Sequence, residues 1–394
     1  MDAIKIQNLD VVFGEQSQKA LSLLDEGKSR QEIIEQTGQV VGVDNVTMSV
    51  KEGEICVLMG LSGSGKSSLL RAVNGLNPIT RGSLQVKDGN SQVELSSCDS
   101  DTLRDLRTHR VSMVFQKFAL MPWLTVLDNV AFGLEMLGMP KAQRREKARE
   151  QLAMVELSDW AKKYPHELSG GMQQRVGLAR AFAMDTDILL MDEPFSALDP
   201  LIRAQLQDEL ISLQKKLNKT ILFVSHDLDE ALKIGNNIAI MESGKLIQHG
   251  KPEEIVLTPE NDYVKDFVAH TNPLNVLKGR SLMQPVSELE REAARLQICP
   301  VQKVWVEARD SQLYLDDKTS LRLIDWRDER VKFDDISKQS VVIASPDIGM
   351  REAIKLKQLS GQPILLVESG ELVGVLDDND FYSGLLGKHN YKAA

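Results

Sequence analysis

The segment at residues 60–67, GLSGSGKS, combines residue types that bind phosphate groups. It matches G-x-x-x-x-G-K-[ST], follows an apolar run and precedes a helix-compatible run. Glycines let backbone N–H groups turn inward onto phosphate oxygens, and a helix N-terminus adds partial positive charge. The lysine reaches the β- and γ-phosphates, and the last hydroxyl binds Mg²⁺. The residues expected to hold a nucleotide are Gly60, Ser62, Gly63, Ser64, Gly65, Lys66, Ser67 and Ser68, with Ser67 also a Mg²⁺ ligand.

Two carboxylates, Asp192 and Glu193, follow a second apolar run at residues 188–191. If that run is a strand, both side chains lie at the carboxyl edge of a parallel sheet, beside the phosphate-binding loop. Asp192 is then expected to hold Mg²⁺ with its hydration shell, and Glu193 to orient or deprotonate the attacking water. An isolated Asp-Glu pair often only caps a turn, and a glycine-rich turn can carry an incidental lysine. The two motifs in this order favour the catalytic interpretation.

Strands and helices alternate around these motifs. Five apolar runs are separated by helical patterns, at residues 54–59, 111–115, 187–191, 220–224 and 237–241. This alternation predicts an α/β fold with a mainly parallel sheet covered by helices. Residues 4–13 and 40–50 are expected to pair as antiparallel strands, with a helical insertion at about 15–38 between them. A helix-rich stretch at about 123–175 is expected to form an arm beside the sheet.

Residues 168–174, LSGGMQQ, run into the helix-compatible segment RVGLARAFA. Together with the loop and the carboxylates, they resemble the ABC-transporter ATPase family. The resemblance implies that Ser169, Gly170 and Gly171 bind the γ-phosphate of an ATP molecule held by a second copy of the chain. It also implies a nucleotide contact for Gln173. Two ATP sites are then completed only in a head-to-tail dimer.

Four further positions fit the family's pattern. Gln116 matches the Q-loop glutamine, a catalytic residue and Mg²⁺ ligand, and Asp199 closes the SALD segment that matches the nucleotide-binding D-loop. His226 matches the switch histidine, which acts in catalysis with Glu193. Phe13 resembles the aromatic residue that stacks on adenine, with a residue of the strand core as the alternative. The implied activity is hydrolysis of ATP with Mg²⁺ as the cofactor.

The resemblance is closer to one branch of the family, the ATPase subunits of importers for glycine betaine, proline betaine and choline, over about residues 6–270. It rests on residues 13–15, the loop GLSGSGKSS, residues 118–133 and residues 196–203. The implied function is to power import of a quaternary or methylated amine such as glycine betaine or choline. A non-transport ABC ATPase of the DNA-repair or translation type, or an importer ATPase for a different small solute, is the alternative.

Such an ATPase works with partner proteins. The branch implies a second copy of the chain, an integral membrane permease and, indirectly, a substrate-binding protein, with the chain peripheral on the cytoplasmic face of the bacterial inner membrane. The segment at residues 117–139 is expected to receive the permease, with Met121, Pro122 and Trp123 nearest the contact. A helical subdomain's own core explains many of its apolar residues equally well.

The composition shifts after Asn272-Pro273, which divides the chain into an ATPase domain, 1–272, and a small α/β domain, 273–394. A strand at 341–344, a helix at 347–360 and a hairpin at 364–376 that turns at Ser369-Gly370 are expected in the latter. These elements lie within residues 341–385, which resemble the second half of a cystathionine-β-synthase-type (CBS) tandem whose first half is degenerate.

One position departs from the CBS pattern. Asp380 matches the aspartate of such modules, but Asp377 stands where Thr or Ser is expected. A carboxylate there would repel a phosphate, which argues against nucleotide binding. Dimerisation, a response to ionic conditions, nucleotide regulation and a purely stabilising role stay open.

Composition excludes some function classes. The chain has 394 residues, 47 Lys and Arg, 57 Asp and Glu, and a net charge of -10, which argues against a nucleic-acid partner. Its three cysteines have no metal-ligand spacing and fit a reducing compartment. No stretch approaches the roughly 18 apolar residues of a membrane span, so a membrane role must come through a partner.

Overall fold

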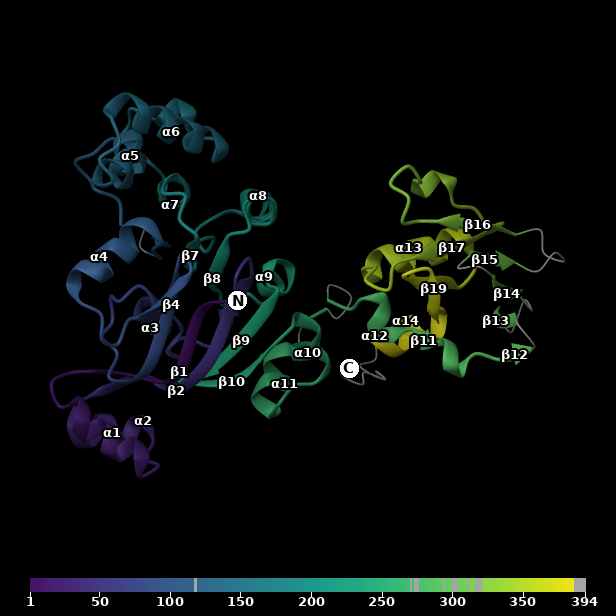
Figure 1. Ribbon diagram of the computed structural model, residues 1–394, viewed down its shortest axis with the longest axis horizontal. Helices are drawn as coiled ribbons and strands as arrows, with labels where there is room; N and C mark the ends of the chain where they lie inside the picture. The colour runs from purple at the N-terminus through teal and green to yellow at the C-terminus, as the bar shows by residue number, and fades with distance from the viewer. Residues whose placement is uncertain are drawn as a thin grey trace. The chain divides into compact units, whose positions relative to one another are not determined.

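The computed structural model describes residues 1–116, 119–269, 271–272, 276–292, 295–299, 304–309, 312–315 and 321–385. The chain forms two compact units, residues 1–252 and 253–394 (Figure 1). This division precedes the Asn272-Pro273 break, whose proline lies outside the described residues. Within the described ranges, no helix has both the length and the apolar character needed to cross a bilayer.

The first unit contains the predicted mainly parallel sheet, in the order β10-β9-β3-β8-β7-β6. Its strands are β3 (Ile55–Met59), β6 (Val111–Val114), β7 (Ile188–Asp192), β8 (Thr220–Val224), β9 (Asn237–Glu242) and β10 (Lys245–Gly250). All neighbours are parallel except β10, which pairs antiparallel with β9. Every residue of β3, β7 and β8 is buried, which accounts for the unbroken apolar runs in the sequence.

A second, antiparallel sheet has the order β2-β1-β4-β5. It consists of β1 (Asp2–Phe13), β2 (Val40–Lys51), β4 (Arg81–Asp88) and β5 (Ser91–Glu94). Its inner residues share one core with β3, β7 and β8. The predicted pairing of the first two strands is confirmed, and their register ends with Phe13 opposite Val40.

The segment between these two paired residues contains α1 (Ser17–Asp25) and α2 (Arg30–Thr37). The Ser29 hydroxyl accepts from the Glu32 N–H, while the Glu32 carboxylate accepts from the Ser29 N–H, so a capping box starts α2. The insertion therefore leaves and re-enters the sheet at adjacent positions.

Helices flank the sheets and build the arm. They are α3 (Lys66–Val73), α4 (Ser100–His109), α5 (Val126–Met136), α6 (Lys141–Met154), α7 (Gly170–Ala183), α8 (Pro200–Leu217) and α9 (Leu228–Ile234), with short 3-10 turns at Ser158–Trp160 and Pro165–Glu167. In Figure 1, α5 and α6 lie at one end of this unit and α1 and α2 at the other. Because α5 packs on both α6 and α7, the arm is tied to the sheet through α7.

The second unit holds two further sheets. One has the order β11-β19-β18-β17-β16 and the other β12-β13-β14-β15. The strands are β11 (Gln284–Pro285), β12 (Arg291–Glu292), β13 (Arg295–Cys299), β14 (Val304–Arg309), β15 (Gln312–Leu315), β16 (Arg322–Asp325), β17 (Ser340–Ala344), β18 (Ile364–Glu368) and β19 (Glu371–Leu376). The helices from Pro252 onward are α10 (Pro252–Leu257), α11 (Asp262–Val268), α12 (Gly279–Leu282), α13 (Met350–Ser360) and α14 (Asp378–Leu385), with 3-10 turns at Val286–Glu288 and Phe333–Asp335.

The predicted hairpin is present, because β18 and β19 pair antiparallel and Ser369 and Gly370 both have positive φ. The predicted start of the preceding helix at residue 347 is wrong. The Ile348 N–H donates to the Ser345 carbonyl in a separate turn, and α13 begins only at Met350.

Candidate nucleotide site

The phosphate-binding loop joins the end of β3 to the start of α3. A Cβ atom on Gly60, whose φ is 138°, would lie 2.1 Å from the Met241 carbonyl oxygen, and one on Gly65, at φ 103°, would lie 2.3 Å from the Gly42 carbonyl oxygen. Gly63 also has a positive φ, but a Cβ there would meet open space. The loop is thus packed against the chain at two glycines and open at the third, which fits a cradle for phosphate.

Lys66 is the first residue of α3, and its side chain turns back into the loop. Its ammonium donates to the carbonyls of Gly60, at 2.7 Å, and Leu61, at 3.0 Å, and to the Ser64 hydroxyl at 3.3 Å. Burial lowers the pKa of Lys66, and the carboxylates of Glu193 and Asp192 oppose that shift. The positive charge therefore lies inside the loop that would receive the phosphates.

Asp192 ends β7 and is fully buried. Its carboxylate accepts a hydrogen bond from the Ser67 hydroxyl at 2.8 Å and pairs with the Arg71 guanidinium at 3.2 Å. Two hard oxygen donors from different elements fit Mg²⁺, which prefers oxygen ligands. Sequence reasoning missed Arg71; the signal was its position one helical turn after Ser67, on the same face of α3.

Glu193 is the point where the three predicted catalytic residues meet. Its Oε2 accepts from Gln116 Nε2 at 3.0 Å and lies 3.5 Å from His226 Nδ1. The three residues follow β6, β7 and β8, so the parallel sheet brings them to one edge. Glu193 is 19% exposed and His226 64% exposed, so this carboxylate is sheltered behind an accessible imidazole. A carboxylate held in this way can serve as a general base towards water.

The backbone of Glu193 is in the left-handed region, with φ 48°. This conformation is uncommon for a residue with a side chain, and it costs on the order of 1 kcal/mol or more. Its N–H donates to the Val224 carbonyl, and its carbonyl accepts from the Ser196 hydroxyl at 3.1 Å and from Gln174 Nε2 at 3.2 Å. Gln174 was not predicted as a site residue, although it is the last residue of the LSGGMQQ segment.

The signature residues lie around the N-terminus of α7. Ser169 caps this helix by accepting from the Met172 N–H, and Ser169 and Gly170 are exposed. A Cβ on Gly170 would meet open space, whereas one on Gly171 would lie 3.3 Å from the Ala197 carbonyl oxygen. These residues present an uncovered helix N-terminus, as an anion site requires.

Gln173, for which a nucleotide contact is predicted, forms hydrogen bonds within its own chain. Its Nε2 donates to the carbonyls of Pro165 and Leu168, at 3.0 and 3.2 Å, so this amide supports the loop before α7 from inside. Asp199 is exposed and caps α8 by accepting from the Ile202 N–H at 3.1 Å. The side chain of Asp199 therefore has a local structural role in addition to any contact with nucleotide.

Phe13 lies beside the phosphate-binding helix despite the inserted residues. A Cβ on Gly42 would be 2.6 Å from its ring and 3.1 Å from the Ser68 hydroxyl, so the glycine leaves room for the ring next to α3. The ring is only partly buried. The insertion contributes its own contact here, because Arg30, the first residue of α2, donates to the Gly63 carbonyl at 3.1 Å.

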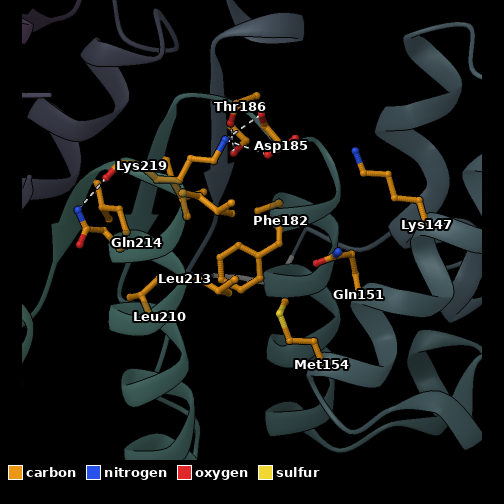
Figure 2. Close-up of a pocket in the computed structure, with 15 residues that line it drawn as sticks. Lys147, Gln151, Met154, Phe182, Asp185, Thr186, Leu210, Leu213, Gln214 and Lys219 are labelled. Carbon is orange, nitrogen blue, oxygen red and sulfur yellow. Dashed lines mark hydrogen bonds and ion pairs between the residues drawn. The ribbon is translucent and has the colours of Figure 1, made fainter. Parts of the chain in front are cut away.

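A cavity of about 250 Å³ lies elsewhere in this unit, and none of the predicted nucleotide-site residues lines it. Figure 2 shows that α6, α7 and α8 surround it and that the Phe182 ring points into it. Lys219 at its edge forms an ion pair with Asp185 at 2.9 Å. Its lining is mainly apolar and comes largely from the arm helix α6 and from α7 and α8.

The chain matches the ABC transporter family over residues 43–196. It is 52% identical over 279 residues to the glycine betaine/proline betaine transport system ATP-binding protein ProV of Escherichia coli strain K12. The aligned region covers 71% of this chain and 69% of that protein. It is 40% identical over 406 residues to the glycine betaine/carnitine transport ATP-binding protein GbuA of Listeria monocytogenes, which covers 98% of each chain.

A solved structure is similar as well. The dimeric post-hydrolysis state of the ATP-binding cassette MJ0796, bound to ADP and Pi, superimposes with a TM-score of 0.55 and 31% identity. The match covers 63% of this chain and 98% of that one. The phosphate-binding loop, the Asp192-Glu193 pair and the signature helix thus occur in a chain that is related along its whole length to transport ATPases. This chain belongs to the ATP-binding subunits of ABC transporters.

Proposed function

We propose that two copies of the chain bind two ATP molecules head to tail, each between the loop at residues 60–67 of one copy and Ser169 to Gly171 of the other. The exposed N-terminus of α7 and the dimeric, ADP-bound cassette MJ0796 support this arrangement. Lys66 and Ser169 of one site then come from different chains. A single chain would hold two half-sites and hydrolyse ATP only on closure of the dimer.

Within each site, the chain's own residues divide the work. Lys66 neutralises charge on the transferred phosphoryl group, and Glu193 orients or deprotonates the attacking water. Gln116 and His226 hold the Glu193 carboxylate from two sides. Ser67, Asp192 and Gln116 would hold Mg²⁺, which supplies charge neutralisation and orientation of the phosphates when bound.

The proposed task of this ATPase is to power import of a quaternary or methylated amine, such as glycine betaine or choline, through a separate permease at the cytoplasmic face of the inner membrane. The observation that carries this proposal is the 40% identity to GbuA over 98% of both chains. The cargo is held by the permease and an external binding protein. The exact amine therefore cannot be specified by the ATPase residues, and the names of ProV and GbuA already differ in their second substrate.

The permease is proposed to dock on Met121, Pro122 and Trp123. Trp123 is 72% exposed. The fully buried Asn129 accepts from the Met121 N–H at 2.8 Å and donates to the Met121 carbonyl at 3.1 Å, so the segment is held firmly from beneath. Val130 and other apolar residues of α5 point into the arm and form its core instead. The start of the expected docking segment, residues 117–118, lies outside the described residues.

The C-terminal unit is proposed to be a CBS-like regulatory or dimerisation module. The succession β17, α13, β18, β19, α14 supports this proposal, because it repeats the strand-helix-strand-strand-helix order of such modules. Asp377 forms an ion pair with Lys357 at 2.7 Å, and its N–H donates to the Asp380 carboxylate at 2.7 Å. The charge of Lys357, which could attract a phosphate, is thereby neutralised, which favours dimerisation or an ionic response over nucleotide binding.

A transport assay tests the proposed function. The chain, its permease and the substrate-binding protein are reconstituted in vesicles, and ATP-dependent uptake of labelled glycine betaine, choline and an amino acid without N-methyl groups is compared. Uptake of a methylated amine is expected, and Glu193→Gln should bind ATP but lower hydrolysis and uptake by about 100-fold or more, since it removes the base. Uptake of the unmethylated amino acid alone would refute the proposed cargo, and near-normal turnover of the variant would refute the role of Glu193.

A further inference from the structure

Gln174 is a buried glutamine whose side-chain amide forms hydrogen bonds through both its nitrogen and its oxygen. It lies in the second turn of α7 and is 1% exposed. Its Nε2 donates to the Glu193 carbonyl at 3.2 Å, and its Oε1 accepts from the Ala197 N–H at 3.2 Å. One side chain of the signature helix thus spans the loop that carries the predicted catalytic glutamate.

This loop depends on external support. Glu193 has a left-handed backbone, and its carbonyl accepts from the hydroxyl and the N–H of Ser196 within the loop and from Gln174 outside it. The first turn of α7 touches the same loop a second time, because a Cβ on Gly171 would lie 3.3 Å from the Ala197 carbonyl oxygen. A shift of the α7 N-terminus cannot leave the loop unchanged, because a buried amide that loses its partners is costly.

We infer that Gln174 is a positioning residue that couples the two ATP sites of the dimer through a single chain. Ser169 and Gly170 at the start of α7 face the nucleotide of the partner's loop, whereas Glu193 acts on the nucleotide of its own loop. The coupling rests on the proposed head-to-tail dimer. Binding of the γ-phosphate at the α7 N-terminus fixes the position of this helix. Through its hydrogen bonds, Gln174 then fixes the position of the Glu193 backbone and so of the Glu193 carboxylate.

Two variants of the full-length chain test the coupling. Gln174→Met keeps the shape of the side chain and removes both hydrogen bonds, whereas Gln174→Glu keeps an acceptor for the Ala197 N–H and loses the donor to the Glu193 carbonyl. ATP hydrolysis is measured over a range of MgATP concentrations. For both variants we expect a kcat about tenfold lower, a KM within about twofold of the parent, and a Hill coefficient that falls from above 1 to about 1.

Controls separate positioning from structure. Gln205→Met makes the same change on the exposed face of α8, where the Gln205 amide donates to the Glu156 carboxylate, and it should leave all three parameters unchanged. Thermal unfolding confirms that the variants are folded, and a purely structural role would lower the melting temperature without changing the Hill coefficient.

The possible results distinguish this inference from the proposed function. Normal kcat and a normal Hill coefficient in Gln174→Met overturn the coupling, and a normal Gln174→Glu overturns the route through the Glu193 carbonyl. Glu193→Gln is measured in parallel. If that variant keeps its turnover, the proposed catalytic role fails; if it loses turnover while Gln174→Met is normal, only the coupling fails.

Discussion

At the scale of single residues, Gly63 and Gly65 show two reasons why the phosphate-binding loop contains glycine: a positive φ and the lack of space for a side chain. Both have positive φ, 79° and 103°, but only at Gly65 would a Cβ collide with backbone, the Gly42 carbonyl oxygen 2.3 Å away. The two positions therefore separate the cost of an unfavourable dihedral angle from the cost of a steric clash.

We expect Gly63→Ala to lower the free energy of unfolding by about 1 kcal/mol, the cost of a left-handed alanine. Gly65→Ala should cost about 3 kcal/mol or more, because the chain must also move away from the new methyl group. Denaturant unfolding of the two variants measures both values. Equal losses in the free energy of unfolding would show that the loop can move away from the Gly42 carbonyl at no energetic cost.

At the scale of elements, the inserted helix α2 supports the phosphate-binding loop. Arg30 donates to the Gly63 carbonyl, and burial lowers its pKa while the Asp44 carboxylate opposes the shift. We expect Arg30→Gln to raise the KM for ATP about fivefold with kcat unchanged, because a hydrogen bond from a charged group to the loop is worth roughly 1 kcal/mol or more. Steady-state kinetics measure the effect.

Lys28→Gln is the matched control for this prediction. Lys28 precedes α2 and pairs with Glu32 at 3.5 Å, within the insertion itself. It should leave the KM unchanged. A change of equal size in both variants would mean that overall charge, and not the contact with Gly63, acts on the nucleotide.

The elements themselves were largely predictable, because fully buried strands such as β3 and β8 appear as unbroken apolar runs. The loops after β6, β7 and β8 were predictable from motif residues at strand ends. Arg30, Arg71 and Gln174 were not, since each is a polar residue on a helix whose role depends on a neighbour far away in the sequence. Local spacing places Arg71 on the same face of α3 as Ser67, but it does not identify Asp192 as its partner, and it identifies neither Arg30 nor Gln174 as a site residue.

At the scale of the whole molecule, the proposed head-to-tail dimer predicts complementation between defective chains. Lys66→Ala and Ser169→Arg each disable both sites of their own dimer. A mixed dimer keeps one intact site, built from Lys66 of one chain and Ser169 of the other. An equal mixture should therefore regain at most about a quarter of the parental ATPase activity, since half of the dimers are mixed and each has one working site.

The mixture is assayed after dissociation and reassociation of the chains, beside each variant alone. Recovery above the two variants is expected. A mixture no more active than its components, although mixed dimers form, would contradict a site shared between chains.

The C-terminal unit carries a pH-dependent group of its own. Burial, with a contribution from the nearby Asp377, raises the pKa of Asp380 to about 6 from an ordinary value of 3.8. The folded unit binds this proton more tightly than the unfolded chain. Protonation of Asp380 therefore contributes fully to the free energy of unfolding below about pH 4, and this contribution is lost as the pH rises through about 6.

Asp380→Asn keeps an acceptor for the Asp377 N–H and removes the titration. Its melting temperature should therefore fall less between pH 4 and pH 7 than that of the parent. Asp378→Asn, on the same helix but 62% exposed, should keep the parental profile. Identical profiles for the parent and Asp380→Asn would contradict the assignment.

The paired ends of the insertion also have a consequence for engineering. Phe13 and Val40 are opposite each other in the β layer, so the ladder closes the intervening loop whatever its length, and longer loops add little entropic cost. Gly27 lies at the exposed turn between α1 and α2, where a Cβ atom would meet nothing within 4 Å. A fluorescent reporter grafted at this turn would leave both sheets intact while standing three residues from Arg30 and its contact with the loop. A reporter attached to the insertion would therefore allow nucleotide binding to be measured by fluorescence in a working transporter.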